Sequence, residues 1–370
     1  MVIKNGSVFV DGKYYNQDVE VIDGKITQIG PNLAGDDVVD ATGKLVFPGF
    51  IETHIHGGDF VSCGDGEEAV RRIARWLPQF GITSFIPTPT ATELEDSVKG
   101  VRGIRAAYGA EGADILGVHF YGPYRHRTIP HYPISIPPTK EHTLAMMDND
   151  LSDVKIITIA PELPGGMEWI KWITDQGIIA MVAFTEGTTS QIYEAADNGA
   201  TLTDHFFNGF PTMDHHEEGS TIGCILEDRL YCQLNLDHIH VAEPFVRLLM
   251  RVKGVDKIIA VSDGSIYMGA PDGEYKRGDM TLIKDETGVR TLEGKLVTGS
   301  HSFDENMRTV LAKGYTLEEI GSMFSENAAK VLGITDRGKI EVGRRGDLVI
   351  MDQGLNVEKT FMLGEVVYEK

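Results

Sequence analysis

The sequence predicts an α/β fold in which a (β/α)8 TIM barrel is joined to a small β-sandwich domain formed by both ends of the chain. Two patterns support this prediction. Between residues 45 and 264, apolar runs of strand length alternate with amphipathic stretches of helical period, as in parallel α/β folds. Residues 1–47 and 338–370 instead contain short alternating apolar runs broken by turn signals, which is typical of a small β-sheet.

The two ends of the chain are expected to complete one β-domain together. In the N-terminal segment, Asp23 and Gly24 suit a tight hairpin turn, and the segment that begins at residue 338 has the same alternating pattern. We therefore predict a small β-domain of residues 1–47 and 338–370, and a catalytic barrel of residues 48–337.

Eight apolar runs are expected to form the barrel strands. They cover residues 45–56, 83–90, 115–122, 156–162, 180–186, 202–208, 231–240 and 258–264. Helical stretches such as 67–81 and 242–254 separate them, and no Gly-x-Gly-x-x-Gly motif follows the first run, which disfavours a doubly wound nucleotide-binding sheet. Residues 270–298 predict a β-hairpin insertion, and 303–314 and 316–333 predict closing helices.

The composition restricts the class of partner. Lys plus Arg number 34 and Asp plus Glu number 55, so the net charge is −21, which repels nucleic acid and anionic membrane surfaces. The three cysteines have no Cys-x-x-Cys spacing and predict neither disulfides nor a thiolate zinc site. No window approaches the roughly 20 apolar residues of a membrane span, and no secretion signal is recognisable. We expect a cytoplasmic protein that acts on a small-molecule substrate.

Polar residues end most of the predicted strands, at the face where barrel enzymes place their active sites. They are His54 and His56, His119 and Tyr121, Glu162, Glu186, His205 and Asn208, His238 and His240, and Asp263. Imidazoles and carboxylates that converge from several strands suit a divalent metal such as zinc, and such a metal lowers the pKa of bound water to about 7. The pattern therefore predicts a metal-dependent hydrolase.

Each of these residues also has a purely structural interpretation. His54 and His56 stand at i and i+2 of a strand, so they point the same way and can hold one ion, or they can simply end the strand. Asp263 lies in a Ser-Asp-Gly sequence that also suits a helix N-cap. His238 and His240 fit a hydrogen-bonded pair at the rim as well as a substrate contact.

The motifs resemble the amidohydrolase superfamily and, within it, the N-acetylglucosamine-6-phosphate deacetylases. The similar segments are 48–58, 117–124, 159–162, 204–210, 215–223, 238–241, 261–264, 271–275, 298–300 and 325–352. The resemblance implies a (β/α)8 barrel with a small β-domain built from both chain ends. It also implies a homodimer that removes acetate from an N-acetylamino sugar phosphate, with metal-activated water attacking the amide.

The resemblance also implies roles for individual residues. Asp263 corresponds to the general acid/base, His54 and His56 to the metal-binding pair, and His205 to a further metal ligand. The residues expected to contact the substrate are His240, Asn208, Gly209, His238, Tyr121 and His119. The metal is expected to be zinc, with iron or manganese as alternatives.

Three residues depart from the family pattern. Tyr121 stands where the family has a glutamate ligand, and a phenol with a pKa near 10 is a poor zinc ligand. The segment after the fifth strand lacks the family's ligand histidine, so Glu186 is expected to coordinate instead. Glu217 replaces an arginine that binds the sugar phosphate, which predicts weak recognition of phosphate unless Arg125, Arg127 or Lys140 compensates.

Three functions remain open from the sequence. The leading one is a metal-dependent deacetylase of an N-acetylamino sugar, in which His54, His56 and Asp263 hold the metal and His205 or Glu186 contributes. The second is a divergent metal hydrolase that acts on another amide, ester or lactone, including an unphosphorylated one. The third is an inactive binding homologue that has lost the metal. Metal analysis separates the third function from the other two.

Overall fold

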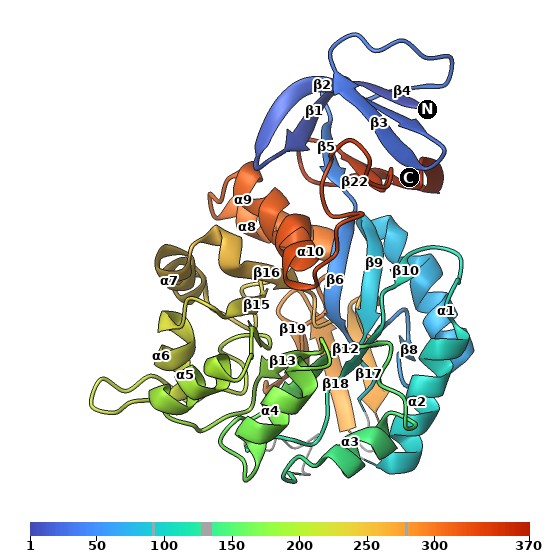
Figure 1. Cartoon of the computed structure of the whole chain (residues 1–370). Coiled ribbons are helices and arrows are strands. Elements are labelled where there is room, and N and C mark those ends of the chain that lie inside the picture. Colours follow the sequence, from blue (N-terminus) through green and yellow to red (C-terminus); the bar gives the residue numbers. More distant parts are fainter. Residues whose placement is uncertain (91–92, 127–134, 278–279) are drawn as a thin grey trace.

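The computed structural model describes residues 1–90, 93–126, 135–277 and 280–370. Parallel strands occupy the centre, and helices surround them (Figure 1). One parallel sheet has the order β10-β9-β6, and the other runs from β11 to β16 in chain order. These strands are β6 (Phe50–Ile55), β9 (Ile82–Pro87), β10 (Asp114–Ile115), β11 (Val118–Phe120), β12 (Val154–Ile159), β13 (Ile179–Val182), β14 (Leu202–Thr203), β15 (Tyr231–Asn235) and β16 (Ile258–Val261).

Every one of the eight predicted runs overlaps a strand of these sheets. The third run is divided at Gly117, so that β10 pairs with β9 while β11 pairs with β12. Gly117 has φ 148°, and a Cβ atom there would lie 2.4 Å from the carbonyl oxygen of Asp153, so only glycine fits this break. Every residue of β6 and β9 is buried, as expected for parallel strands covered on both faces.

The described helices mostly follow the strands along the chain and cover them (Figure 1). They are α1 (Glu67–Trp76), α2 (Leu94–Ala106), α3 (Lys140–Met146), α4 (Gly166–Thr174), α5 (Thr189–Asp197), α6 (Ser220–Leu226), α7 (Glu243–Lys253), α8 (Phe303–Ala312), α9 (Leu317–Gly321) and α10 (Asn327–Val331). In α1 the residues Val70, Ile73 and Ala74 are buried in the core, which is the spacing of one helix face. None of the helices in the described ranges is long and apolar enough to span a membrane.

The two ends of the chain share one mixed sheet, at the top of Figure 1, with the order β23-β22-β21-β5-β1-β2-β3 and β4 paired to β1. Its strands are β1 (Val2–Val10), β2 (Lys13–Ile22), β3 (Lys25–Gly30), β4 (Val38–Asp40), β5 (Leu45–Pro48), β21 (Leu348–Met351), β22 (Val357–Met362) and β23 (Glu365–Glu369). Residues from both ends form one apolar cluster, which includes Ile3, Val19, Leu348 and Phe361.

The first predicted barrel run is divided between the two sheets. Residues 45–48 form β5 of the terminal sheet, and β6 begins at Phe50. A Cβ atom at the intervening Gly49 would lie 2.1 Å from Oγ1 of Thr83, so the chain passes closely against β9 at this point. The apolar pattern is continuous across Gly49 and could not reveal the division.

The predicted hairpin insertion is a four-stranded antiparallel sheet. It consists of β17 (Gly273–Arg277), β18 (Met280–Asp285), β19 (Gly288–Thr291) and β20 (Leu296–Thr298). Buried Leu282 and Val289 pack with Tyr267 in a small apolar cluster of their own. A shorter antiparallel pair, β7 (Gly57–Gly58) and β8 (Val61–Ser62), follows β6.

The buried side chain of Glu52 connects the first and last parallel strands. Its Oε1 accepts a hydrogen bond from the backbone N–H of His54, and its Oε2 accepts one from the N–H of Ser262, both at 2.8 Å. Burial raises the pKa of Glu52 to about 7, although these hydrogen bonds lower it. Backbone bonds from Asp263 N–H to His54 O and from His56 N–H to Gly264 O join the same two segments.

We expect Glu52→Gln to destabilise the fold by about 1–3 kcal/mol, because the amide NH2 group then faces a backbone N–H that has lost its acceptor. Urea denaturation followed by circular dichroism measures this change. Glu68→Gln is the matched control, because the side chain of Glu68 is 81 % exposed. Equal denaturation midpoints for the two variants would contradict the role of Glu52.

Candidate active site

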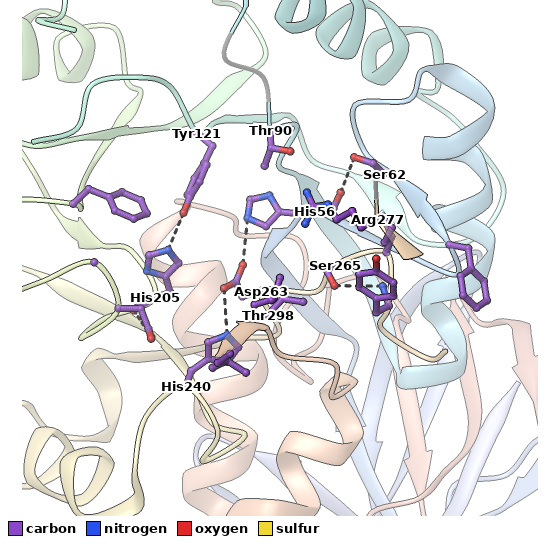
Figure 2. A pocket seen from close by; sticks show the side chains of 18 of the residues that line it. His56, Ser62, Thr90, Tyr121, His205, His240, Asp263, Ser265, Arg277 and Thr298 are labelled. Carbon is purple, nitrogen blue, oxygen red and sulfur yellow. Dashed lines mark hydrogen bonds and ion pairs between the residues drawn. The ribbon is translucent and has the colours of Figure 1, made fainter. Parts of the chain in front are cut away.

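A cavity of about 470 Å³ opens beyond the carboxyl ends of the parallel strands (Figure 2). The residues that line it come from the ends of several strands, from the segment around β8 and from the β17–β20 sheet. They include His56, Tyr121, Phe184, His205, Asn208, Gly209, His240, Asp263, Ser265, Tyr267 and Arg277. The predicted location of the site at the strand ends therefore agrees with the structure.

Three predicted ligands meet at this cavity. One donor atom from each of His54, His56 and Asp263 lies within 4.8 Å of the other two. The Nε2 atoms of the two histidines are 3.1 Å apart, and Oδ1 of Asp263 lies 3.2 Å from His56 Nε2 and 3.6 Å from His54 Nε2. Burial would raise the pKa of Asp263, but the hydrogen bond from His56 and the charge of His54 lower it well below its ordinary value.

The other ring nitrogen of each histidine faces an acceptor. Nδ1 of His56 lies 2.8 Å from the carbonyl oxygen of Thr88. Nδ1 of His54 lies 2.7 Å from Asp204 and 3.2 Å from Oε1 of Gln233. Each acceptor suits a proton on Nδ1, and a divalent ion would replace any proton on Nε2, which is how metal-binding histidines are held. The donor set therefore fits a divalent cation.

Asp204 is a site residue that the sequence analysis missed. Its carboxylate is fully buried between His54, at 2.7 Å, and His205, at 3.6 Å. Burial raises the pKa of Asp204, but the two histidines lower it to about 2. Burial lowers the pKa of His54, whereas Asp204 and Asp263 raise it to about 9. The Asp-His sequence at the end of the sixth predicted strand was the available signal.

His205 lies beside this group but faces aromatic side chains. Its Nε2 is 2.9 Å from the hydroxyl of Tyr121, and the ring of Phe184 packs edge-on against it at 5.4 Å. Burial lowers the pKa of His205. The structure thus brings His205 to the cavity as predicted, with its nitrogen engaged by the phenol. Its role as a fourth ligand stays a prediction.

The structure corrects the expectation that Glu186 is a ligand. Glu186 is exposed and lines a separate cavity of about 140 Å³. Its backbone N–H donates to Oε1 of Glu162, and the chain then enters α5 through the N-cap residue Thr188. This turn directs residue 186 away from the histidines. Glu217 lines the same separate cavity. The sequence suggested that Glu217 repels a substrate phosphate, but the side chain does not line the catalytic cavity.

His119 is also corrected, because it supports the cavity wall from behind. It is fully buried, and its two ring nitrogens lie 3.0 Å from Oγ1 of Thr88 and 2.9 Å from Oγ1 of Thr158. Burial lowers its pKa well below the ordinary value, so the ring is neutral. Its edge packs against His54 with the ring centroids 5.0 Å apart.

His240 lines the cavity, and its orientation is fixed by Asp237, which sequence reasoning did not identify. Nδ1 of His240 lies 2.7 Å from Asp237, and its Nε2 accepts the N–H of Gly299 at 3.2 Å. Its Nε2 is also 4.0 Å from Oδ2 of Asp263. Burial lowers the pKa of His240, but Asp237 and Asp263 raise it. His238 is not among the residues that line the cavity.

Asn208 and Gly209 line the cavity as predicted. The side-chain amide of Asn208 donates to the carbonyl oxygen of His205 at 3.0 Å. Gly209 has φ 73°, and a Cβ atom there would lie 2.6 Å from the ring of Phe184, so the position requires glycine. The contact of these residues with substrate stays a prediction.

Arg125 and Lys140, which were suggested as a replacement phosphate site, do not line the cavity. Arg125 is buried, donates to the carbonyl oxygens of Tyr121 and Gly122, and stacks over the ring of Phe184. Lys140 lies over the ring of Trp172. Arg127 lies outside the described residues.

Comparisons with known proteins find relatives over nearly the whole chain. The model of the amidohydrolase family matches residues 45–227 and 262–367. The N-acetylglucosamine-6-phosphate deacetylase of Lysinibacillus sphaericus is 30 % identical, with 99 % of this chain and 97 % of that protein covered. The N-acetylgalactosamine-6-phosphate deacetylase of Escherichia coli O157:H7 is 27 % identical, with 96 % of each chain covered.

Solved structures show the same fold over the whole chain. The N-acetylglucosamine-6-phosphate deacetylase of Thermotoga maritima superposes with a TM-score of 0.85 at 26 % identity, and the match covers 100 % of both chains. The enzyme of Pasteurella multocida gives a TM-score of 0.90 at 23 % identity, covering 100 % of this chain and 99 % of that one. Together, the family match and the relatives show that this chain belongs to the amidohydrolase family.

Proposed function

We propose that the protein is a metal-dependent amidohydrolase that cleaves the acetamide of an N-acetylamino sugar or its phosphate to the amine and acetate. The observation that carries this proposal is the group of His54, His56 and Asp263 at the cavity, with the two Nε2 atoms 3.1 Å apart. The curated deacetylases that match nearly the whole chain support the choice of substrate class.

His54, His56 and Asp263 would hold the metal, and His205 lies beside them. Zinc is the first choice for nitrogen and oxygen donors, with iron or manganese as alternatives. A bound divalent ion would supply Lewis acidity toward water and the amide carbonyl. Asp204 and the carbonyl oxygen of Thr88 hold the ring protons of the two histidines away from the cavity.

Asp263 is placed to move the proton of the reaction. Hydrolysis adds the hydroxyl of water to the acyl carbon, breaks the C–N bond and transfers a proton to the amine nitrogen. The Oδ1 atom of Asp263 faces the histidine pair, whereas Oδ2 faces His240. A carboxylate in this position accepts the proton from water and returns it to the leaving amine.

The architecture and the assembly are part of the proposal. We propose that the two parallel sheets form one closed (β/α)8 barrel of residues 48–337, and the parallel bridge between Ile55 and Gly264 supports closure. Residues 1–47 and 338–370 would form the small domain. The likeness to the deacetylases leads us to propose a cytoplasmic homodimer. Light scattering can test the dimeric state.

A second candidate is a hydrolase of another amide, ester or lactone at the same metal. Tyr121 and Phe184 line the cavity side by side and favour this candidate. They would offer a substrate one phenol and one phenyl ring. Activity toward such compounds, with none toward N-acetylamino sugars, would select this candidate. A folded protein that binds no metal would instead be an inactive homologue.

We expect Asp204→Asn to weaken zinc binding 10–100-fold, because the amide no longer fixes the ring of His54 in its metal-binding orientation. Competition with a chromophoric chelator measures the affinity. Glu186→Gln is the control and should bind zinc like the wild-type protein, since Glu186 lies at another cavity. Equal weakening by both substitutions would contradict the assigned site.

We expect Asp263→Asn to lower turnover at least 100-fold in the metal-saturated protein, which is the usual contribution of a positioned acid/base. Release of acetate from N-acetylglucosamine and from its 6-phosphate provides the assay. Glu217→Gln should retain wild-type turnover. If the metal-loaded wild-type protein releases no acetate from either sugar, the proposed substrate class is wrong.

A further inference from the structure

Among the described residues, Arg277 is the one lysine or arginine that lines the catalytic cavity. It is the last residue of β17 and therefore belongs to the sheet inserted after the last parallel strand. Figure 2 shows Arg277 on the side of the cavity that carries Ser62 and Ser265, away from His205. The cavity thus has a cationic side that the strand-end motifs do not reveal.

The register of β17 directs Arg277 toward the cavity. Successive side chains of a strand point to opposite faces, so Arg277 shares a face with Tyr275. The ring of Tyr275 packs on Tyr267 at 5.4 Å and on Phe60 at 6.0 Å, and both of these rings line the cavity. Lys276 points the other way and donates to Oγ1 of Thr281 at 2.6 Å.

No carboxylate among the described residues neutralises the charge of Arg277. Lys276 pairs with Glu274 at 3.6 Å, and Lys284 pairs with Asp272 at 2.8 Å. Arg277 has no ion pair within the part of the chain that the structure describes. Two carboxylates line the same cavity, Asp65 and Asp263. Asp65 accepts the N–H of Ser62 at 2.8 Å, and Asp263 belongs to the histidine group.

From this placement we infer that Arg277 binds a phosphate group of the substrate and determines the preference of the enzyme for a phosphorylated N-acetylamino sugar. A guanidinium group can bind a phosphate through two parallel hydrogen bonds. The cavity volume of about 470 Å³ lies within the usual range for small-molecule sites. The inference rests on the proposed function for the identity of the sugar, and it concerns a residue outside the catalytic group.

Binding to the metal-loaded protein tests the inference independently of turnover. Calorimetry compares N-acetylglucosamine with its 6-phosphate and its 1-phosphate. Every protein compared, with or without a change at Arg277, carries Asp263→Asn so that the sugars are not cleaved during the titration. We expect the protein with Arg277 intact to bind at least one phosphate ester tenfold or more tightly than the neutral sugar, and Arg277→Gln to remove that preference. Arg277→Lys should retain part of it, because the charge remains and the paired donors are lost. Lys276→Gln is the matched control on the opposite face and should keep the full preference.

Kinetics give the second readout. Arg277→Gln should lower kcat/KM at least tenfold more for the preferred phosphate ester than for the neutral sugar, mainly through KM. Equal losses of kcat/KM for both substrates would assign Arg277 a structural role and overturn the inference. The inference would also be overturned if the protein with Arg277 intact bound neither ester more tightly than the neutral sugar. A third outcome separates the two proposals. If Arg277 is required for the tighter binding of a phosphate ester but the wild-type protein releases no acetate, the inference is supported and the proposed function is contradicted.

Discussion

The geometry of the site depends on two hydrogen bonds that the buried carboxylate of Glu52 accepts. The carboxylate accepts the backbone N–H of His54 in β6 and that of Ser262, which directly follows β16. The donors that could hold a metal are His54 itself, His56 two residues later and Asp263 next to Ser262. A change in the separation of these two strands would therefore move Asp263 relative to both imidazoles. A buried carboxylate is costly unless its oxygens are hydrogen-bonded, and here both oxygens bind N–H groups of the segments that they align.

The fold could be predicted because apolar periodicity reports burial directly. Strands buried on both faces give continuous apolar runs, and all eight predicted runs overlap a parallel strand. The boundaries were less predictable, because Gly49 and Gly117 divide strands through close approaches of the backbone that leave no apolar signal. The sequence indicated a hairpin where the structure has four antiparallel strands.

The site was predictable where a residue closely follows the end of a strand and lines the cavity, as His56 and Asp263 do. The site was less predictable where the loop after the strand determines which cavity a side chain lines. Glu186 follows β13 in the sequence as closely as other site residues follow their strands, but the capped start of α5 turns it away. Asp204 and Asp237 were missed because they act through histidines. Their sequence signal is only an acidic residue one to three positions before a histidine, which also occurs in exposed loops such as Asp214–His216.

Charge is the property for which the sequence alone was most misleading. Glu217 is the most visible departure in the phosphate motif, yet it lies in a separate cavity with Glu186. Exposed charges of this kind are screened over about 8–10 Å at physiological salt, so their effect within the catalytic cavity is small. Arg277 lies in the inserted sheet, outside the strand ends where catalytic motifs are sought, but it lines the cavity directly. The cationic side of the cavity therefore depends on the insertion, which can vary without disturbing the strands that position the histidines and Asp263.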